Sequence, residues 1–206
     1  MSYHIYHTEG FIIDSIDAGE ANKLLTLYTE DLGLVRAAAQ AVRTLGSKLR
    51  PSIQDLSFAS LALVRGKEVW RLTGAKKLIS LYDKRLSLGG RVVLARILSL
   101  VKRLVAGESR NNELFAILST LSSFCFKERG LFKEDRGASK DMESLEMIAS
   151  LRVLASLGYK TDQKLLEKYV KAGESSVWNV GLVDEMMGDM AAARPEVARL
   201  IRESHL

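Results

Sequence analysis

The stretch AQAVRTLGSKLR, residues 39–50, carries three cations and no acid. Arg43, Lys48 and Arg50 could each neutralise a phosphate of a nucleic acid, because Lys and Arg make many of the contacts between proteins and the phosphate backbone. The same composition is also typical of a solubilising surface loop. The chemistry of these twelve residues is therefore either phosphate binding or simple solvation.

The distribution of charge along the chain favours a polyanionic partner. The chain has 206 residues and a net charge of +5. Residues 1–103 hold 16 Lys and Arg against 9 Asp and Glu, whereas residues 104–206 hold 14 against 16, which together give the 30 cations and 25 acids of the chain. Such asymmetry is expected where one part of a protein faces a polyanion.

Other residue patterns that could do chemistry give weak signals. Asp14, Asp17 and Glu20 cluster near one turn, where carboxylates are usually hydrogen-bonded to the backbone or solvated. His4 and His7 would point to opposite faces of a strand. Neither glycine-rich nucleotide-binding motif occurs, and a single cysteine cannot build a cysteine-based zinc site. The sequence therefore predicts a protein that is not an enzyme and has no cofactor and no metal.

The sequence also shows no targeting or membrane segment. The N-terminus lacks the basic and apolar regions of a signal peptide. The longest apolar stretch, near Val92–Val105, is interrupted by charges and is shorter than the ~20 residues of a membrane span. A cytoplasmic protein without a membrane partner is expected.

Up to about residue 80, the pattern of residues is typical of β-strands. Short runs with β-branched or aromatic residues predict five strands, at residues 10–14, 22–29, 34–42, 57–65 and 68–78. A loop and a short helix are expected between the third and fourth strands, which is the layout of an OB-fold barrel. Tyr28 and Phe58 are expected in the core, and Trp70 is interpreted as either a core residue or a platform on which a base could stack.

From about residue 83, the apolar period changes to that of helices. Over residues 91–105 the apolar side chains fall on one arc and the cations, beginning with Arg91, on the opposite arc, which predicts an amphipathic helix. Further helices are predicted at about 112–128, 141–157, 162–172 and 195–204, the last with Pro195 as its first helical residue. The expected fold class is α+β, with an OB-fold DNA-binding barrel at residues 1–80 and a helical domain at residues 81–206.

Several short motifs, taken in order, resemble the N-terminal domain of the RecO family of bacterial recombination mediators. They are Glu9–Gly10, Gly19–Glu20, KLLTL at 23–27, Gly33 and VRG at 64–66. The segment LRVLASLGYKTD (151–162) resembles part of the family's helical domain, and LIRESHL (200–206) resembles its last helix. The similarity covers most of the chain.

The resemblance implies a non-enzymatic, nucleoid-associated DNA-binding protein of DNA repair, DNA damage and DNA recombination. Members of the family bind single- and double-stranded DNA, anneal complementary strands, contact the C-terminal tail of the single-strand-binding protein SSB and, with RecR, help to load RecA. Many members also carry a four-cysteine zinc module, which this sequence lacks, so no zinc is expected. From the resemblance and the pattern of basic residues, the expected DNA-binding residues are Lys23, Arg36, Arg43, Lys48, Arg50, Arg65, Arg71 and Arg91.

Two alternatives remain open at this point. The chain could be a protein-interaction adaptor whose basic groove receives an acidic peptide such as the SSB tail. It could also be an RNA-binding OB protein, because phosphate contacts barely distinguish RNA from DNA.

Overall fold

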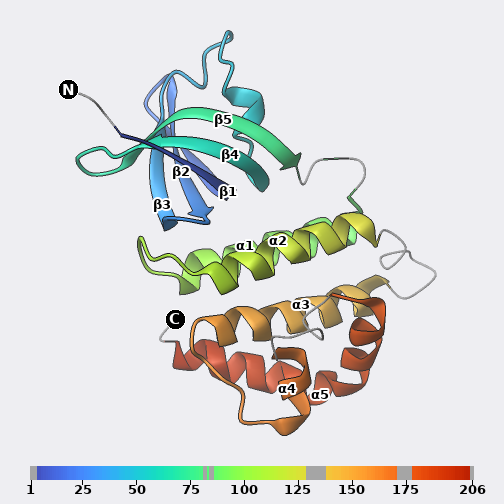
Figure 1. Cartoon of the computed structure of the whole chain (residues 1–206). Coiled ribbons are helices and arrows are strands. Elements are labelled where there is room, and N and C mark those ends of the chain that lie inside the picture. Colours follow the sequence, from blue (N-terminus) through green and yellow to red (C-terminus); the bar gives the residue numbers. More distant parts are fainter. Residues whose placement is uncertain (1–3, 81–82, 84–85, 129–137, 171–177, 205–206) are drawn as a thin grey trace. The chain divides into compact units, whose positions relative to one another are not determined.

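The computed structural model describes residues 4–80, 83, 86–128, 138–170 and 178–204. The chain forms two compact units (Figure 1). One unit, the barrel unit, contains residues 1–83 and 105–112, and the other, the helical unit, contains residues 84–104 and 113–206. The domain boundary predicted at residue 80 stays a prediction.

Four of the five strands of the barrel unit lie close to the predicted runs, whereas β1 is 14 residues long and extends beyond the predicted run 10–14 at both ends. They form a closed barrel in the order β1-β2-β3-β5-β4, and the short helix predicted between the third and fourth strands is the 3-10 helix η1 (Arg50–Ser52). The predicted OB-fold barrel is therefore confirmed. The strands are β1 (Ile5–Ala18), β2 (Asn22–Thr29), β3 (Gly33–Ala39), β4 (Ser57–Val64) and β5 (Trp70–Ser80).

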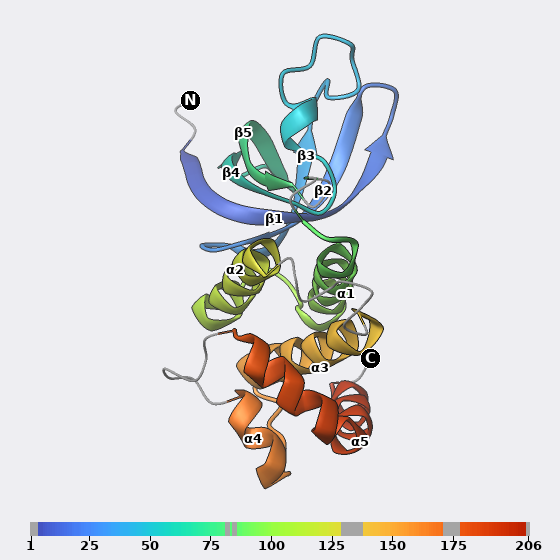
Figure 2. The ribbon, with the colours of Figure 1, turned by 90° about the vertical axis from the view of Figure 1, so that its right-hand side faces the viewer.

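Strand β1 is long and curved, and it holds the barrel together (Figure 2). Its first part, Ile5–Ile12, pairs with β4, and its second part, Gly10–Ala18, pairs with β2. The register shifts between Ile12 and Asp14, where an irregularity lets one strand serve two neighbours. The barrel closes through a short parallel pairing in which Ala37 lies opposite Trp70.

The barrel core follows from the alternation of side chains along each strand. In β3, Val35, Ala37 and Ala39 are buried, whereas Arg36 between them is exposed. The alanines leave room for larger inward side chains such as Leu25. The buried cluster is Ile12, Leu25, Leu27, Val35, Ala37, Ala39, Val42, Ile53, Ala59, Leu61, Leu63, Trp70 and Leu72.

Residues 105–112, which connect two helices, pack against the barrel. The indole N–H of Trp70 donates to Glu108 Oε1 at 2.9 Å, and the Tyr28 hydroxyl donates to the carbonyl of Asn111 at 3.4 Å. Burial raises the pKa of Tyr28 to about 12, so its hydroxyl stays protonated and remains a donor. A Cβ placed on Gly33 would lie 2.2 Å from the carbonyl oxygen of Ser109, so the two backbones are in close contact.

The helical unit is organised around one central helix. Helix α3 (Ala138–Ser156) contacts α1 (Leu88–Leu104), α4 (Lys164–Val170) and α5 (Val180–Glu203). The remaining helix is α2 (Asn112–Lys127). The amphipathic pattern predicted for α1 is confirmed, because its apolar arc is buried and Arg96, Lys102 and Arg103 are exposed. None of the described helices is long and apolar enough to cross a membrane.

The prediction for the last helix was wrong. Helix α5 begins at Val180, so Pro195 lies inside the helix and does not start it. The N-terminal signal is Asn179, whose side chain accepts a hydrogen bond from the backbone N–H of Leu182 at 2.8 Å. The missing N–H of Pro195 costs one intrahelical hydrogen bond, which the burial of the helix against α3 outweighs.

One buried carboxylate ties α5 to the segment before α4. Glu196 is 4% exposed and accepts hydrogen bonds from the Arg199 guanidinium at 2.8 Å and from the Thr161 hydroxyl at 2.8 Å. The hydrogen bond from Arg199 is the main reason why the pKa of Glu196 falls to about 2. Because the folded-state pKa lies below the unfolded value of 4.5, Glu196 stabilises the fold above about pH 4.5, and this contribution is lost as the pH falls toward 2.

Replacing Glu196 with glutamine is expected to lower the free energy of unfolding at pH 7 by about 1 to 3 kcal/mol, because a buried charged acceptor is lost. The loss should shrink between about pH 4.5 and pH 2. Urea unfolding at a series of pH values measures both effects. Glu203→Gln is the matched control, since Glu203 also pairs with Arg199 but is half exposed. Equal losses in the two variants would contradict a special role for the buried carboxylate.

Candidate nucleic-acid interface

A cationic hollow of about 440 Å³ opens in the barrel unit where β2 begins and β3 ends. Lys23, the second residue of β2, pairs with Ala39, the last residue of β3. The loop that follows β3 then returns to the β1–β2 turn, where the backbone N–H of Arg43 donates to the carbonyl of Ala21 at 3.0 Å. The hollow is lined by Asp17, Lys23, Val42, Arg43, Arg50, Ile53 and Gln54.

The structure therefore brings together three of the predicted DNA-binding residues, Lys23, Arg43 and Arg50. Lys23 is half-buried and its ammonium donates to the Ser15 hydroxyl at 3.0 Å. Arg50 is exposed at the first position of η1. Asp17 is the one acid that lines the hollow. The hollow therefore carries a positive local charge, which suits an anionic ligand.

Arg43 already has an acidic partner within the hollow. One guanidinium nitrogen lies 3.2 Å from Asp17 Oδ2, and the other donates to the carbonyl of Gly19 at 2.9 Å. Both side chains of the ion pair are partly exposed, and such surface pairs contribute at most about 1 kcal/mol. A phosphate could therefore replace the Asp17 carboxylate at little cost. No pattern in the sequence indicated this pairing.

A second group of predicted residues lies on the outer face of β3 and β5. Arg71 pairs with Ala38, and Arg36 lies two residues before Ala38, so the two arginines share one face of neighbouring strands. Arg65 stands in the β4–β5 turn, which projects from the barrel (Figure 1), and its guanidinium lies 3.7 Å from Glu108 Oε2. OB folds commonly bind nucleic acids across strands 2 and 3 and at the loops between strands 1 and 2 and between strands 4 and 5. Of this group, Arg36 on β3 and Arg65 in the β4–β5 turn lie in those places, whereas Arg71 lies on β5.

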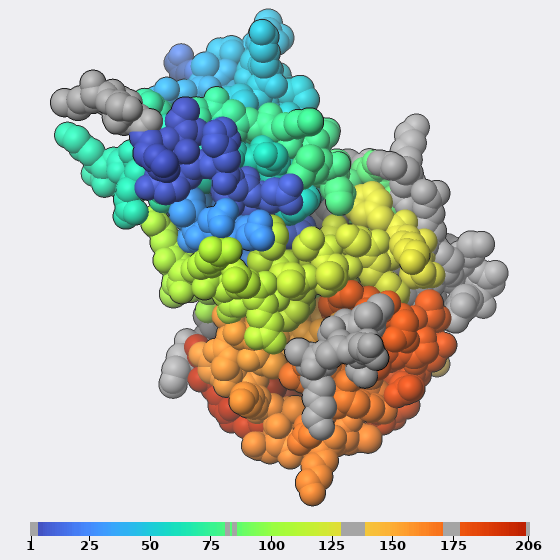
Figure 3. Space-filling model, viewed as in Figure 1, coloured from blue at the N-terminus to red at the C-terminus, as the bar shows by residue number. Residues whose placement is uncertain are grey.

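Two predicted residues belong to neither group. Lys48 is exposed in the loop between β3 and η1, which stands at the edge of the barrel unit (Figure 3, cyan). Arg91 belongs to the helical unit, and its guanidinium donates to the carbonyl of Leu86 at 3.0 and 3.2 Å. Its side chain therefore holds the residues that precede α1.

The three barrel aromatics weighed in the sequence, Tyr28, Phe58 and Trp70, are not available for stacking on bases. Tyr28 is fully buried, and Trp70 and Phe58 are 3% and 9% exposed. For Trp70, which the sequence left open between core and platform, the structure decides for the core. Its ring packs edge-on against Tyr6, at 5.1 Å between centroids, and its N–H is taken by Glu108. Tyr6 itself is 37% exposed, so the surface offers one aromatic ring beside its contacts to phosphates.

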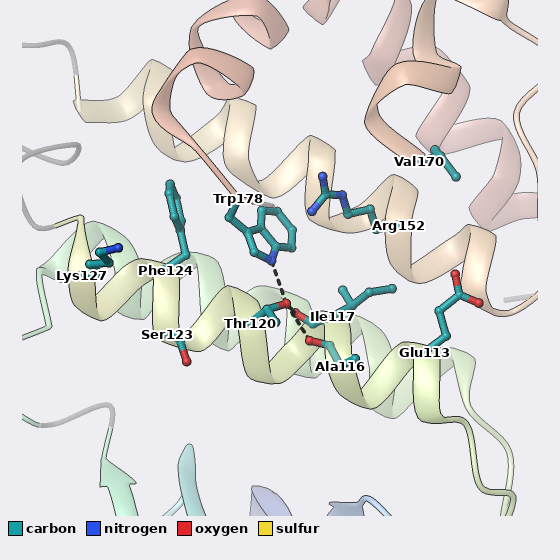
Figure 4. A pocket seen from close by; sticks show the side chains of 10 residues that line it. All are labelled: Glu113, Ala116, Ile117, Thr120, Ser123, Phe124, Lys127, Arg152, Val170 and Trp178. Atoms are coloured by element: carbon teal, nitrogen blue, oxygen red, sulfur yellow. Dashed lines mark hydrogen bonds between the residues drawn. The ribbon is translucent and has the colours of Figure 1, made fainter. Parts of the chain in front are cut away.

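The helical unit holds a second hollow, of about 470 Å³ and mainly apolar (Figure 4). Trp178 forms one wall, donating its indole N–H to the Thr120 hydroxyl at 2.9 Å. The Arg152 guanidinium lies 4.2 Å from the centre of the Trp178 ring, and its Nε–H donates to the carbonyl of Tyr169 at 2.8 Å. Burial lowers the pKa of Arg152 to about 10, which still leaves it charged at neutral pH. Lys127 adds a second cation at the rim.

The part of the chain that the structure describes offers no candidate metal site. Within the described residues, no three His, Cys, Asp or Glu side chains form a group that could hold a metal ion. The only cysteine, Cys125, is buried in α2, and burial raises the pKa of its thiol to about 12.

Comparison with known proteins identifies the barrel. Residues 1–81 match the family model described as recombination protein O, N terminal. The barrel therefore resembles the N-terminal domain of the RecO family. A DNA repair protein RecO from Dehalococcoides mccartyi is 30% identical over 160 residues, which are 77% of this chain and 58% of that protein. RecO of a Roseiflexus species is 34% identical over 118 residues, which are 57% of this chain and 41% of that protein.

A third relative gives the same picture. RecO of Acetivibrio thermocellus is 24% identical over 152 residues, 74% of this chain and 57% of that protein. The chain thus matches between 41% and 58% of the length of these three RecO proteins. The resemblance to RecO that the barrel motifs indicated is confirmed.

Proposed function

We propose that this RecO relative is a non-enzymatic mediator of recombinational DNA repair that binds single- and double-stranded DNA through its barrel. The observation that carries the proposal is the hollow lined by Lys23, Arg43 and Arg50. The one acid that lines it, Asp17, is paired with Arg43, and a phosphate could take its place. Cations there would position phosphates without reading the base sequence. Arg36 and Arg71 on the outer face of β3 and β5, together with Lys48, would contact further phosphates of the same strand.

Strand annealing follows from the same charges. Two single strands repel each other through their phosphates, and a basic surface lowers that repulsion while leaving base edges free to pair. We propose that the protein anneals complementary strands and acts with RecR and SSB to load RecA.

A titration of labelled single-stranded DNA at several salt concentrations tests DNA binding. Affinity is expected to rise with oligonucleotide length and to fall with salt, as for any ligand held through phosphates. An RNA strand of the same sequence tests the RNA-binding alternative, which tighter binding of RNA would favour. Annealing of complementary strands, measured with and without cognate SSB, tests the mediator role. No binding of either nucleic acid at low salt would contradict the proposal.

The ion pair in the hollow supplies a sharper prediction. Replacing Asp17 with asparagine is expected to strengthen binding of a single strand by about two- to fivefold at ~0.1 M salt, because the phosphate no longer competes with a fixed carboxylate for Arg43. Fluorescence anisotropy measures the change. Asp31→Asn is the matched control, because Asp31 is an exposed, ion-paired acid of the same unit that does not line the hollow. Unchanged affinity in the Asp17 variant would show that Arg43 does not meet phosphate.

A second candidate function rests on the hollow of the helical unit. Its apolar walls, with two cations, Arg152 and Lys127, against one acid, Glu113, suit an acidic peptide that carries an apolar side chain, and we propose that it receives the C-terminal tail of SSB. A labelled tail peptide should bind at least about threefold more weakly to Lys127→Glu than to the unchanged chain, whereas Lys140→Glu, on an exposed residue of α3, should have no effect. Equal binding by both variants would exclude this hollow.

A further inference from the structure

Leu45 is the most exposed large apolar side chain of the described residues. Its relative exposure is 101%, so it touches almost nothing else in the protein. Burying a leucine is worth about 2 kcal/mol, and here that contribution is absent. Single exposed apolar residues are common on protein surfaces, so exposure alone decides nothing. The surroundings of Leu45 are what distinguish it.

The loop that carries Leu45 is held by hydrogen bonds. The N–H of Ser47 donates to the carbonyl of Thr44 at 3.2 Å, so Leu45 and Gly46 are the two central residues of a turn. The Thr44 hydroxyl donates in turn to the carbonyl of Ala41 at 2.7 Å.

The base of the loop is fixed to the β1–β2 turn. The N–H of Ala41 donates to the Asn22 side chain at 2.9 Å, and Ala41 adopts a left-handed backbone with φ of 52°. The N–H of Arg43 donates to the carbonyl of Ala21 at 3.0 Å. The structure therefore presents Leu45 outward from a built turn.

The charges around Leu45 indicate what could cover it. Arg43, Lys48 and Arg50 lie on either side of it in the sequence, and no acid occurs between Leu32 and Gln54. The apolar side chain of Leu45 among these cations suits a ligand that has an anionic backbone and carries groups with apolar faces, as a nucleic acid does. Three barrel aromatics that could stack on bases, Tyr28, Phe58 and Trp70, are buried here, whereas Tyr6 on β1 is 37% exposed.

We propose that Leu45 packs against the face of a base in a single strand whose phosphates lie on the cationic hollow. The inference rests on the proposed DNA-binding function. It adds that the protein prefers a strand whose base faces are accessible. In a duplex those faces are covered by stacking, and inserting an apolar wedge costs a few kcal/mol per step. Leu45 therefore favours single-stranded over double-stranded DNA.

The experiment compares two probes with the same phosphates. One is a labelled single-stranded oligonucleotide, and the other is an abasic strand of equal length. The unchanged chain should bind the base-bearing strand about three- to tenfold more tightly, and Leu45→Ser should abolish most of this preference without changing the salt dependence. Leu45→Phe should keep or increase the preference. Leu78→Ser, at an exposed leucine of β5, is the matched control and should behave as the unchanged chain.

The possible failures can be told apart. If Leu45→Ser keeps the full preference for bases, the inference is wrong while DNA binding stands. If neither strand binds at low salt, the proposed function fails and the inference falls with it. If the substitution instead weakens binding to vesicles of anionic lipid and leaves both strands unaffected, Leu45 contacts membranes, which also overturns the inference. Because the Leu45 side chain is fully exposed, neither Leu45→Ser nor Leu45→Phe should change the melting temperature by more than about 2 °C.

Discussion

Replacing Arg43, Lys48 and Arg50 together with alanine is expected to make the slope of log affinity against log salt shallower by about 2. Each phosphate contact to a single strand contributes about −0.7 to this slope, because it releases condensed counterions. Between 50 and 200 mM salt, the advantage of the unchanged chain should therefore shrink by more than tenfold. The loss should be similar for oligonucleotides of unrelated sequence, since phosphates carry no base information.

A charge-matched control separates local contacts from net charge. Lys140, Lys160 and Lys164 are three exposed lysines of the helical unit, and their replacement by alanine removes the same three charges. This control should leave the slope within about 0.5 of its original value. An unchanged slope in the loop variant would make the loop a plain solvated turn. The outer face of β3 and β5, with Arg36 and Arg71, would then be the next surface to test.

The second large effect is expected from Gly33→Ala. Gly33 has φ of 69°, and a Cβ there would lie 2.2 Å from the carbonyl oxygen of Ser109. A left-handed backbone costs an alanine about 1 to 2 kcal/mol, and the clash must in addition displace residues 105–112 from the barrel. We expect a total loss of more than about 3 kcal/mol in the free energy of unfolding.

Gly19→Ala is the control that isolates the contact from the backbone conformation. Gly19 has nearly the same φ, 70°, but a Cβ placed on it would have no described atom of another segment within 4 Å. Urea unfolding of both variants should therefore show the larger loss for Gly33→Ala, and the difference measures how tightly residues 105–112 are seated. Similar losses would mean that this segment yields easily.

The barrel could be predicted from the sequence because its signals are local. Alternating residues such as Leu25 and Leu27, with turn residues between the runs, identify each strand without knowledge of its neighbours. The helix expected between the third and fourth runs then indicates the layout of an OB fold. Local signals failed at Pro195, where a residue typical of helix starts lies within α5, because the side chain of Asn179 already caps that helix.

The contacts that shape the candidate site could not be predicted, because they join residues distant in the chain. Arg43 and Asp17 are 26 positions apart, and no pattern marks Asp17 as the one acid of the hollow. The sequence could not decide whether Trp70 is a core residue or a stacking platform for the same reason. The position of its side chain depends on a hydrogen bond to Glu108, which lies in a segment between two helices. Basic residues indicated the ligand class, whereas their grouping required the fold.

The packing of residues 105–112 against the barrel has a consequence for synthesis on the ribosome. Trp70 precedes its partner Glu108 by 38 residues, and all of α1 is translated between them. At 5–20 residues per second, the nascent barrel waits roughly 2 to 8 s for the segment that satisfies its buried indole. The barrel unit is therefore not built from one continuous segment, and its folding cannot be completed when residue 83 has been translated. Its completion has to follow the emergence of α1, so the order of translation itself couples the maturation of the two units.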